Sequence, residues 1–217
     1  MKIVRYVQHS TSDEIGTAIA TAARRRFQRF GYAKTSMQEI AADCGMSVAN
    51  LYRYHEGKLA IAEAVAVAEQ AAQFVACDQA VQSARTGTAD RLIALFHALI
   101  DSSRRRIRQT PLLFELGLDV ARETPSLRQS FLQEVEARIG AILQAGENGT
   151  GPLGADAIRA QSRLILTANA PFVLPWMMLN EPFGNPRPQV SPLVRCLVTG
   201  LHAARRPSAV DATNPRR

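Results

Sequence analysis

Two helix-start signals, eleven residues apart, constrain the fold of this chain more than any other feature. Ser36 is followed three residues later by Glu39, the pattern of a capping box, in which each side chain satisfies a free backbone amide of a new helix. Ser47 supplies a second N-cap, and Gly45 between them ends the first helix after little more than two turns. The sequence therefore predicts two short helices joined by a tight turn.

A longer amphipathic helix precedes this pair. Its apolar residues recur at spacings of four, four, four and three, which places them on one helical face. They are Ile15, Ile19, Ala23, Phe27 and Phe30. The arginines of the same segment, at positions 24, 25, 26 and 29, lie off this face and are expected in solvent. A longer helix that braces two short ones around a turn predicts a helix-turn-helix.

The rest of the chain also reads as helical, because few stretches alternate with the period of two that a half-buried strand needs. Short segments that contain glycine or proline separate the helical patterns. These patterns cover residues 58–84, 90–107, 112–121, 126–143, 155–179 and 191–204. We therefore expect an all-α protein.

The positive charge is concentrated toward the two ends of the chain. The net charge is +7; nine basic and five acidic side chains leave +4 in residues 1–60, and four basic and one acidic leave +3 in residues 205–217. Residues 61–204 are therefore neutral. A basic N-terminal module on a neutral body is typical of a protein that binds a polyanion at one end. A solvated basic surface without a partner is the alternative.

Several other classes of protein find little support. The longest apolar run, residues 164–179, is too short to cross a bilayer and contains Pro171 and Pro175, and no signal peptide opens the chain, so we expect a cytoplasmic protein. We expect the scattered cysteines Cys44, Cys77 and Cys196 to be small buried hydrophobes rather than redox sensors. Without a phosphate loop, a metal-ligand set or a catalytic frame, we expect no enzyme activity, cofactor or metal.

In the second short helix, residues 48–54, we expect Leu51 to face inward, and the remaining surface is the candidate for reading DNA. Asn50 can bond N6 and N7 of adenine, and Val48 and Ala49 can touch a thymine methyl, each good pair giving ~1 to 3 kcal/mol of discrimination. An exposed polar residue on a surface helix is the alternative for Asn50. Nearby hydroxyls and cations are suited to phosphates, although tyrosines here are equally suited to the core. The expected DNA contacts are Thr35, Ser36, Ser47, Val48, Ala49, Asn50, Tyr52, Arg53, Tyr54 and Lys58.

Over residues 13–61, about a quarter of the chain, the sequence resembles the N-terminal pattern of the tetracycline-repressor (TetR) family. The matching residues are Ile19, Ala20, Ala23, Phe27, Gly31, Thr35, Ile40, Ala41, Gly45, Ser47, Leu51, Tyr52, Tyr54 and Lys58. One departure is His55, where the family usually has phenylalanine. We expect a partly buried histidine with satisfied partners, and looser or pH-sensitive packing is the alternative.

The resemblance implies an all-helical homodimer whose N-terminal heads bind an inverted-repeat operator and whose larger domain takes up a small molecule. It assigns phosphate contacts to Thr35, Tyr52, Tyr54 and Lys58, and base contacts to positions 48–50. The expected parts of the chain are a flexible N-terminal arm (1–12), the helix-turn-helix DNA-binding domain (13–60), a helical effector-binding and dimerisation domain (61–206) and a disordered tail (207–217).

The larger domain offers candidates for an effector cavity and a dimer surface, with ordinary core as the alternative for both. The cavity candidates are Phe96, His97, Phe114, Phe172, Trp176 and Met177. The dimer candidates are Ile158, Leu164, Ile165, Leu193, Val194, Leu197 and Leu201. The resulting hypothesis is a repressor that binds a palindromic operator as a dimer and is released by an effector. The alternative is a nonspecific nucleic-acid packaging protein.

Overall fold

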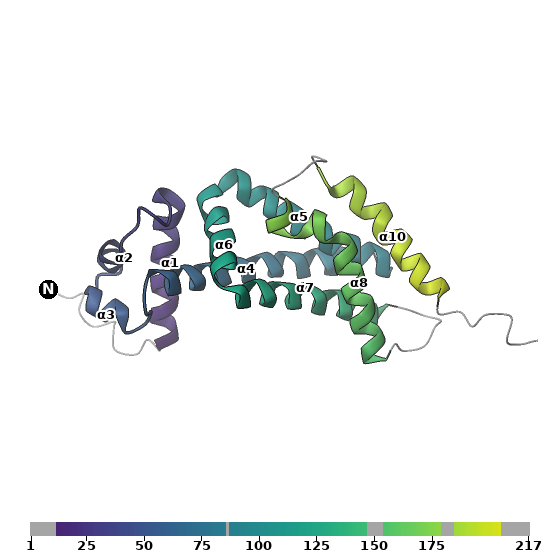
Figure 1. The fold of residues 1–217 in the computed structure, drawn as a ribbon, viewed down its shortest axis with the longest axis horizontal. Coiled ribbons are helices and arrows are strands. Elements are labelled where there is room, and N and C mark those ends of the chain that lie inside the picture. Colours follow the sequence, from purple (N-terminus) through teal and green to yellow (C-terminus); the bar gives the residue numbers. More distant parts are fainter. Residues whose placement is uncertain (1–11, 86, 147–153, 179–184, 205–217) are drawn as a thin grey trace, which may run out of the picture. The chain divides into compact units, whose positions relative to one another are not determined.

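The computed structural model describes residues 12–85, 87–146, 154–178 and 185–204. Within these ranges it contains helices and no strand (Figure 1), which confirms the all-α prediction. The predicted arm lies outside the described residues except for Ser12, which begins the first helix, and the predicted tail lies outside them entirely. The helices are α1 (Ser12–Phe30), α2 (Met37–Asp43), α3 (Val48–Tyr52), α4 (Lys58–Ser83), α5 (Thr88–Gln109), α6 (Pro111–Glu123), α7 (Pro125–Ala145), α8 (Ala155–Val173), α9 (Pro175–Met178) and α10 (Arg187–Ala203).

The chain divides into two compact units. The first comprises residues up to Gln73 together with Ser103–Gln129, and the second comprises Phe74–Ser102 and the residues from Ser130 onward. This division differs from the boundary expected at residue 60, because α6 packs against α1 and joins the first unit. The boundary between DNA-binding and effector-binding functions stays a prediction.

The core of the first unit is built from α1, α2, α3, α4 and α6. Its buried side chains are Ile19, Ala20, Ala23, Phe27, Met37, Ile40, Ala41, Leu51, Ile61, Ala62, Val65, Leu113, Leu116 and Val120. Gly31 ends α1 with a φ of 81°, a left-handed conformation that glycine adopts without steric cost. The chain can therefore reverse direction immediately after α1 and present α2 to the same core.

The longest helix, α4, spans ~39 Å at 1.5 Å per residue. Ile61 and Val65 lie in the core of the first unit, whereas Phe74 and Cys77 lie in that of the second. Among the described helices, α4 has the length and mean hydropathy needed to cross a membrane, a property that core helices of soluble proteins share. Helix α4 therefore contributes buried side chains to the cores of both units.

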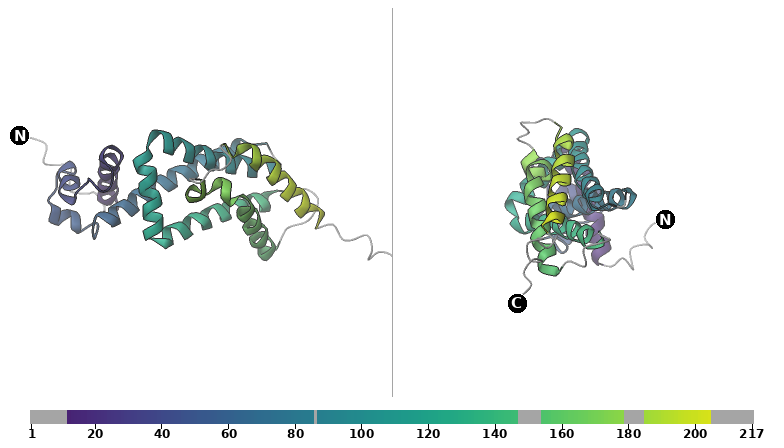
Figure 2. Two further views of the ribbon diagram at one scale, coloured as in Figure 1. Left: turned by 45° about the horizontal axis from the view of Figure 1, so that its top comes forward. Right: turned by 90° about the vertical axis from the view of Figure 1, so that its right-hand side faces the viewer.

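The core of the second unit takes buried residues from α4, α5, α7, α8, α9 and α10, and an aromatic cluster forms part of it. The Phe131 ring lies 5.3 Å from that of Phe74 and 5.6 Å from that of Trp176, between ring centroids. The first pair is tilted and the second is edge-on, and aromatic contacts at these distances are favourable beyond the apolar area that they bury. Helices α8 and α10 contact one another in this unit (Figures 1 and 2).

Prolines set helix boundaries that the sequence pattern placed elsewhere. We expected one helix over residues 155–179, but α8 ends at Val173 and Pro175 begins α9. Leu174 between them is extended, as proline requires of the residue before it. Helix α10 starts at Arg187, four residues before the expected position, because Pro188 lies in its first turn, where a missing amide hydrogen has no cost.

The three cysteines have different surroundings. Cys77 is fully buried, and burial raises the pKa of its thiol to about 12, so it behaves as a small core hydrophobe. Cys44 is half-buried, and Cys196 is exposed on α10. The expectation of burial is therefore confirmed for Cys77 and wrong for Cys196.

Candidate nucleic-acid interface

Both predicted N-caps are present. Ser36 Oγ accepts a hydrogen bond from the Glu39 amide at 3.3 Å, and Glu39 Oε2 accepts one from the Ser36 amide at 2.8 Å, which completes the capping box. Ser47 Oγ accepts from the Asn50 amide at 3.1 Å. Gly45 has a φ of 64° in the turn between α2 and α3. Local hydrogen bonds thus define the start of each of the two short helices in the helix-turn-helix.

Packing holds the two short helices in place, because helices of seven and five residues are unstable alone. Ile40 of α2 and Leu51 of α3 have no exposed surface and share the core with Phe27 of α1. Leu51 is the buried residue of α3, as the sequence predicts. The outer side of α3 therefore has a fixed orientation relative to α1.

Two arginines of α1 form ion pairs that the sequence pattern does not reveal. Arg26 Nε and Nη2 donate to the two carboxylate oxygens of Asp43 at 2.5 and 2.9 Å, and Arg26 Nη1 lies 3.1 Å from Glu39 Oε1. Arg24 Nε donates to Glu69 of α4 at 2.5 Å. These two arginines, which we expect in solvent, are half-buried and ion-paired. The acidic residues at positions 39 and 43, one turn apart on α2, were the available signal.

These contacts keep the α2 carboxylates ionised. The hydrogen bond from Arg26 lowers the pKa of Asp43, and the hydrogen bond from the Ser36 amide lowers that of Glu39. The pKa of the Arg26 guanidinium is raised by its hydrogen bond with Asp43. All three groups are therefore charged at neutral pH.

The outer surface of α3 carries most of the expected base and phosphate contacts. Ala49 and Arg53 are exposed, Asn50 is half-buried, and Tyr52 is 51% exposed. Val48 and Tyr54 are half-buried and pack against the core of the first unit. Ser47, the N-cap of α3, is exposed. A small, polar and cationic surface thus projects from a helix whose inner side is anchored.

Three other expected contacts form hydrogen bonds within the helix-turn-helix domain, residues 13–60, here called the head. Thr35 is only 3% exposed, and its hydroxyl donates to the Gly31 carbonyl oxygen at 2.9 Å. Lys58 Nζ donates to the carbonyl oxygens of Tyr32 and Thr35, each at 3.0 Å, and lies 4.3 Å from the Tyr32 ring centroid. Ser36 caps α2. These side chains brace the turn between α1 and α2, and their contact with phosphate stays a prediction.

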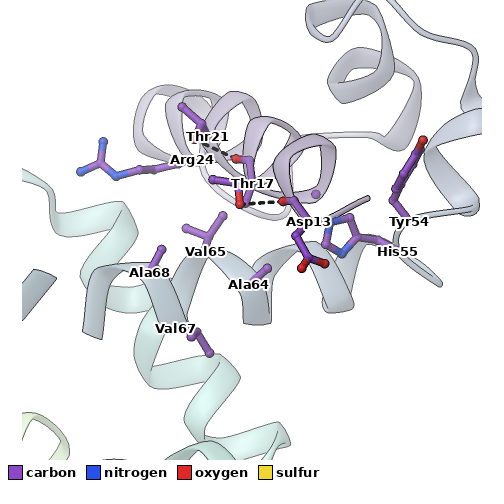
Figure 3. Close-up of a pocket in the computed structure, with 12 residues that line it drawn as sticks. Asp13, Thr17, Thr21, Arg24, Tyr54, His55, Ala64, Val65, Val67 and Ala68 are labelled. Carbon is purple, nitrogen blue, oxygen red and sulfur yellow. Dashed lines mark hydrogen bonds between the residues drawn. The ribbon is translucent and has the colours of Figure 1, made fainter. Parts of the chain in front are cut away.

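A groove of about 580 Å³ lies between α1 and α4 in the first unit (Figure 3). The hydroxyls of Thr17 and Thr21 donate to carbonyl oxygens of α1 itself, so toward a partner in the groove each hydroxyl oxygen can only accept a hydrogen bond. His55 lines the groove; its Nε2 is buried and has no hydrogen-bond partner among the described residues. The expectation that His55 has satisfied partners is therefore wrong for this nitrogen.

The six expected cavity residues do not gather in one unit. Phe114 belongs to the first unit, where the Arg106 guanidinium lies 5.9 Å from its ring centroid. In the second unit Phe96 is fully buried in the core, Phe172 and Trp176 pack partly buried against it, and Met177 is 42% exposed. An effector cavity lined by these residues stays a prediction.

His97, the sixth expected cavity residue, links α5 to α10. Its Nδ1 lies 3.1 Å from Arg187 Nη2, and its Nε2 lies 3.2 Å from Ser191 Oγ. Because arginine can only donate, Nδ1 is the acceptor and Nε2 carries the hydrogen. Arg187 also pairs with Asp101 at 3.0 Å. Burial, and the charge of Arg187, lower the pKa of His97 below its ordinary 6.5.

Acid should therefore destabilise the protein through His97. Below about pH 6.5 the unfolded chain binds a proton at this residue that the folded chain does not yet bind, so the free energy of unfolding falls with the pH. We expect the His97→Gln variant to lose less stability between about pH 7 and about pH 5 than the wild type. Urea unfolding at each pH measures this difference, and equal losses in the two proteins would contradict it.

The expected dimer residues of α8 and α10 differ in accessibility. Ile165 and Val194 have no exposed surface and belong to the core of the second unit. Leu164 is 50% exposed. The half-buried members are Ile158, Leu193, Leu197 and Leu201. Apolar surface that a second copy could cover therefore remains on both helices.

Comparison with known proteins covers both parts of the chain. The family model described as "Bacterial regulatory proteins, tetR family" matches residues 19–65, and that described as "Tetracyclin repressor-like, C-terminal domain" matches residues 88–187. Together they span more than half of the chain. A search of curated proteins finds no match.

Solved structures share the fold. A protein from Pseudomonas aeruginosa PAO1 described as a transcriptional regulator has a TM-score of 0.58 and 19% identity, over 94% of this chain and 97% of that one. The TetR-family repressor AlkX from Dietzia sp. strain DQ12-45-1b has a TM-score of 0.58 and 14% identity, over 88% and 97%. A transcriptional regulator from Cytophaga hutchinsonii ATCC 33406 has a TM-score of 0.55 and 22% identity, over 85% and 96%. The two family matches and this helix-turn-helix geometry identify the chain as a member of the TetR family of DNA-binding transcription regulators.

Proposed function

We propose that this protein is a cytoplasmic repressor that binds an inverted-repeat operator as a homodimer and releases it when a small-molecule effector binds. The observation that carries the proposal is the outer surface of α3, where Ala49, Asn50 and Arg53 project from a helix anchored by Leu51. A helix held in this way can enter a major groove as a rigid element. Repression is the usual activity of the family.

Base reading falls to the first turn of α3. Asn50 offers an amide that bonds adenine at two positions, and Ala49 has a methyl group suited to thymine. Val48 packs against the core of the first unit, so it supports this surface more than it reads DNA. Tyr52 and Arg53 lie at the end of α3, where a hydroxyl and a guanidinium can hold phosphates and fix the register on the duplex.

A homodimer has the two-fold symmetry that matches an inverted-repeat operator. The exposed Leu164 on α8 and the half-buried Leu197 and Leu201 on α10 give an apolar surface on two adjacent helices. A two-fold pair built on this surface carries two heads, which require half-sites about one helical turn or more apart.

Effector control requires a connection between α5 and the head. Within the first unit, Glu69 of α4 accepts from Arg24 of α1 at 2.5 Å and lies 3.6 Å from Arg106 Nε of α5. The preceding part of α5 carries the cavity candidates Phe96 and His97. A ligand that favours one placement of α5 would therefore change the equilibrium between operator-binding and released states. Unchanged operator affinity at saturating effector would contradict this switch.

Selection of bound sequences from a random duplex pool tests the DNA-binding proposal. We expect an inverted repeat to be enriched. In that site, Asn50→Ala should relax the preference at one position per half-site, at a cost of ~1 to 3 kcal/mol, whereas Arg53→Ala should weaken binding to all sequences alike. Lys58 is a poor probe of phosphate contact, because its substitution also removes two hydrogen bonds inside the head.

The competing proposal of nonspecific packaging makes the opposite prediction for the wild type. A packaging protein binds random duplex and the selected repeat with similar affinity at fixed salt, whereas a regulator prefers its own site by about a thousandfold or more. A ratio near one would therefore favour packaging.

A further inference from the structure

One guanidinium holds both ends of α2. Arg26 of α1 forms a two-bond fork with Asp43, the last residue of α2, and an ion pair with Glu39 in its first turn. Glu39 and Asp43 are one helical turn apart and so lie on the same face of α2. The Arg26 side chain is 20% exposed, against 45% for Glu39 and 37% for Asp43. Arg26 is therefore less exposed than either carboxylate that it binds.

The same cluster reaches the N-cap of α2. Glu39 Oε2 accepts hydrogen bonds from the backbone amide and the hydroxyl of Ser36 at 2.8 and 2.9 Å, while its Oε1 faces Arg26. A continuous set of polar contacts thus runs from Ser36 through Glu39 and Arg26 to Asp43. It follows one side of α2 from its N-cap, Ser36, to its last residue, Asp43.

We infer that Arg26 is a positioning residue for DNA binding, which fixes α2 on α1 and thereby sets the placement of α3. The inference rests on the proposed reading of DNA by α3. A seven-residue helix has little intrinsic stability, and an arginine–carboxylate fork fixes direction as well as distance. The turn to α3 is bonded to α2, since the Met46 amide donates to the Ala41 carbonyl oxygen at 3.0 Å. A displacement of α2 therefore moves the start of α3.

The Asp43→Asn variant separates this role from the effect of net charge, because the two predict opposite changes in operator affinity. Loss of a negative charge from the head strengthens its attraction to DNA phosphates. Loss of the fork instead releases α2 from α1. We expect Asp43→Asn to weaken operator binding about fivefold, although the head becomes more positive.

Glu56→Gln is the matched control. It removes the same charge from an exposed residue in the loop before α4, outside the contacts of Arg26. We expect Glu56→Gln to bind the operator at least as tightly as the wild type. Arg26→Lys keeps the charge of Arg26 but lacks the planar fork, so it should weaken binding in the same direction as Asp43→Asn.

Hydrogen exchange measured by mass spectrometry on the full-length protein gives a readout that needs no DNA. Amides from Ile40 to Cys44 should exchange faster in Asp43→Asn and at the wild-type rate in Glu56→Gln. Circular dichroism at the assay temperature ensures that only folded variants are compared. Wild-type affinity together with wild-type exchange in Asp43→Asn would overturn the inference. Absence of operator preference in the wild type would refute the proposed function, and the exchange experiment would still decide whether Arg26 positions α2.

Discussion

Replacing Leu164 by glutamate is expected to convert the protein into a monomer that binds an inverted-repeat operator about a hundredfold more weakly. Leu164 is 50% exposed on α8, so the folded monomer tolerates a polar side chain there. In the proposed dimer the same position is covered by apolar groups of a second copy, where an unpaired carboxylate is strongly unfavourable. Each head then binds its half-site without help from a tethered partner.

Sedimentation and a binding titration with the selected operator measure the two effects. Val75→Glu is the control, because Val75 is also an exposed apolar residue, 56% accessible, but lies on α4. We expect Val75→Glu to remain dimeric and to keep its operator affinity. A Leu164→Glu protein that sediments as a dimer would show that α8 is not part of the interface.

Replacing Leu51 by alanine is expected to remove ~2 to 5 kcal/mol from the free energy of unfolding of the first unit. Leu51 has no exposed surface and is the buried side chain of a five-residue helix, so its removal leaves a cavity and releases α3. Operator binding should be lost, because the reading surface no longer has a fixed orientation. The dimer should persist, since the proposed interface lies on α8 and α10.

Urea unfolding, operator binding and sedimentation of the same preparation test this expectation. Leu51→Met is the control, because a swap that nearly conserves volume costs less than about 1.5 kcal/mol. It should retain most of the operator affinity. Wild-type operator affinity in Leu51→Ala would mean that α3 is held in place by contacts other than those of its buried leucine.

The parts of the head that the sequence predicts are those that local physics determines. The N-caps at Ser36 and Ser47, the turn at Gly45 and the inward side chain of Leu51 follow from spacings of a few residues. Backbone amides at a helix start need an acceptor, and an apolar residue in a short helix needs a core. Both requirements can be recognised in the local sequence before the distant residues that meet them are known.

Features that depend on contacts between distant residues were not predictable in this way. The partners of Arg26 lie 13 and 17 residues away, and the Lys58 ammonium reaches carbonyl oxygens 23 and 26 residues away. The addition of α6 to the first unit likewise depends on tertiary packing. On α8, Leu164 and Ile165 are both apolar, and periodicity alone does not decide which is exposed.

The internal bonds of Arg24, Arg26 and Lys58 also change how the charge of the head should be counted. Nine cations occur in residues 1–60, but these three enter any complex already oriented by partners within the first unit. They cannot swing out to follow a curved or shifted backbone without breaking those bonds. Adaptation to duplexes of different shape therefore falls to exposed side chains such as Arg53, and the formal charge overstates how many cations can adjust to a new phosphate position.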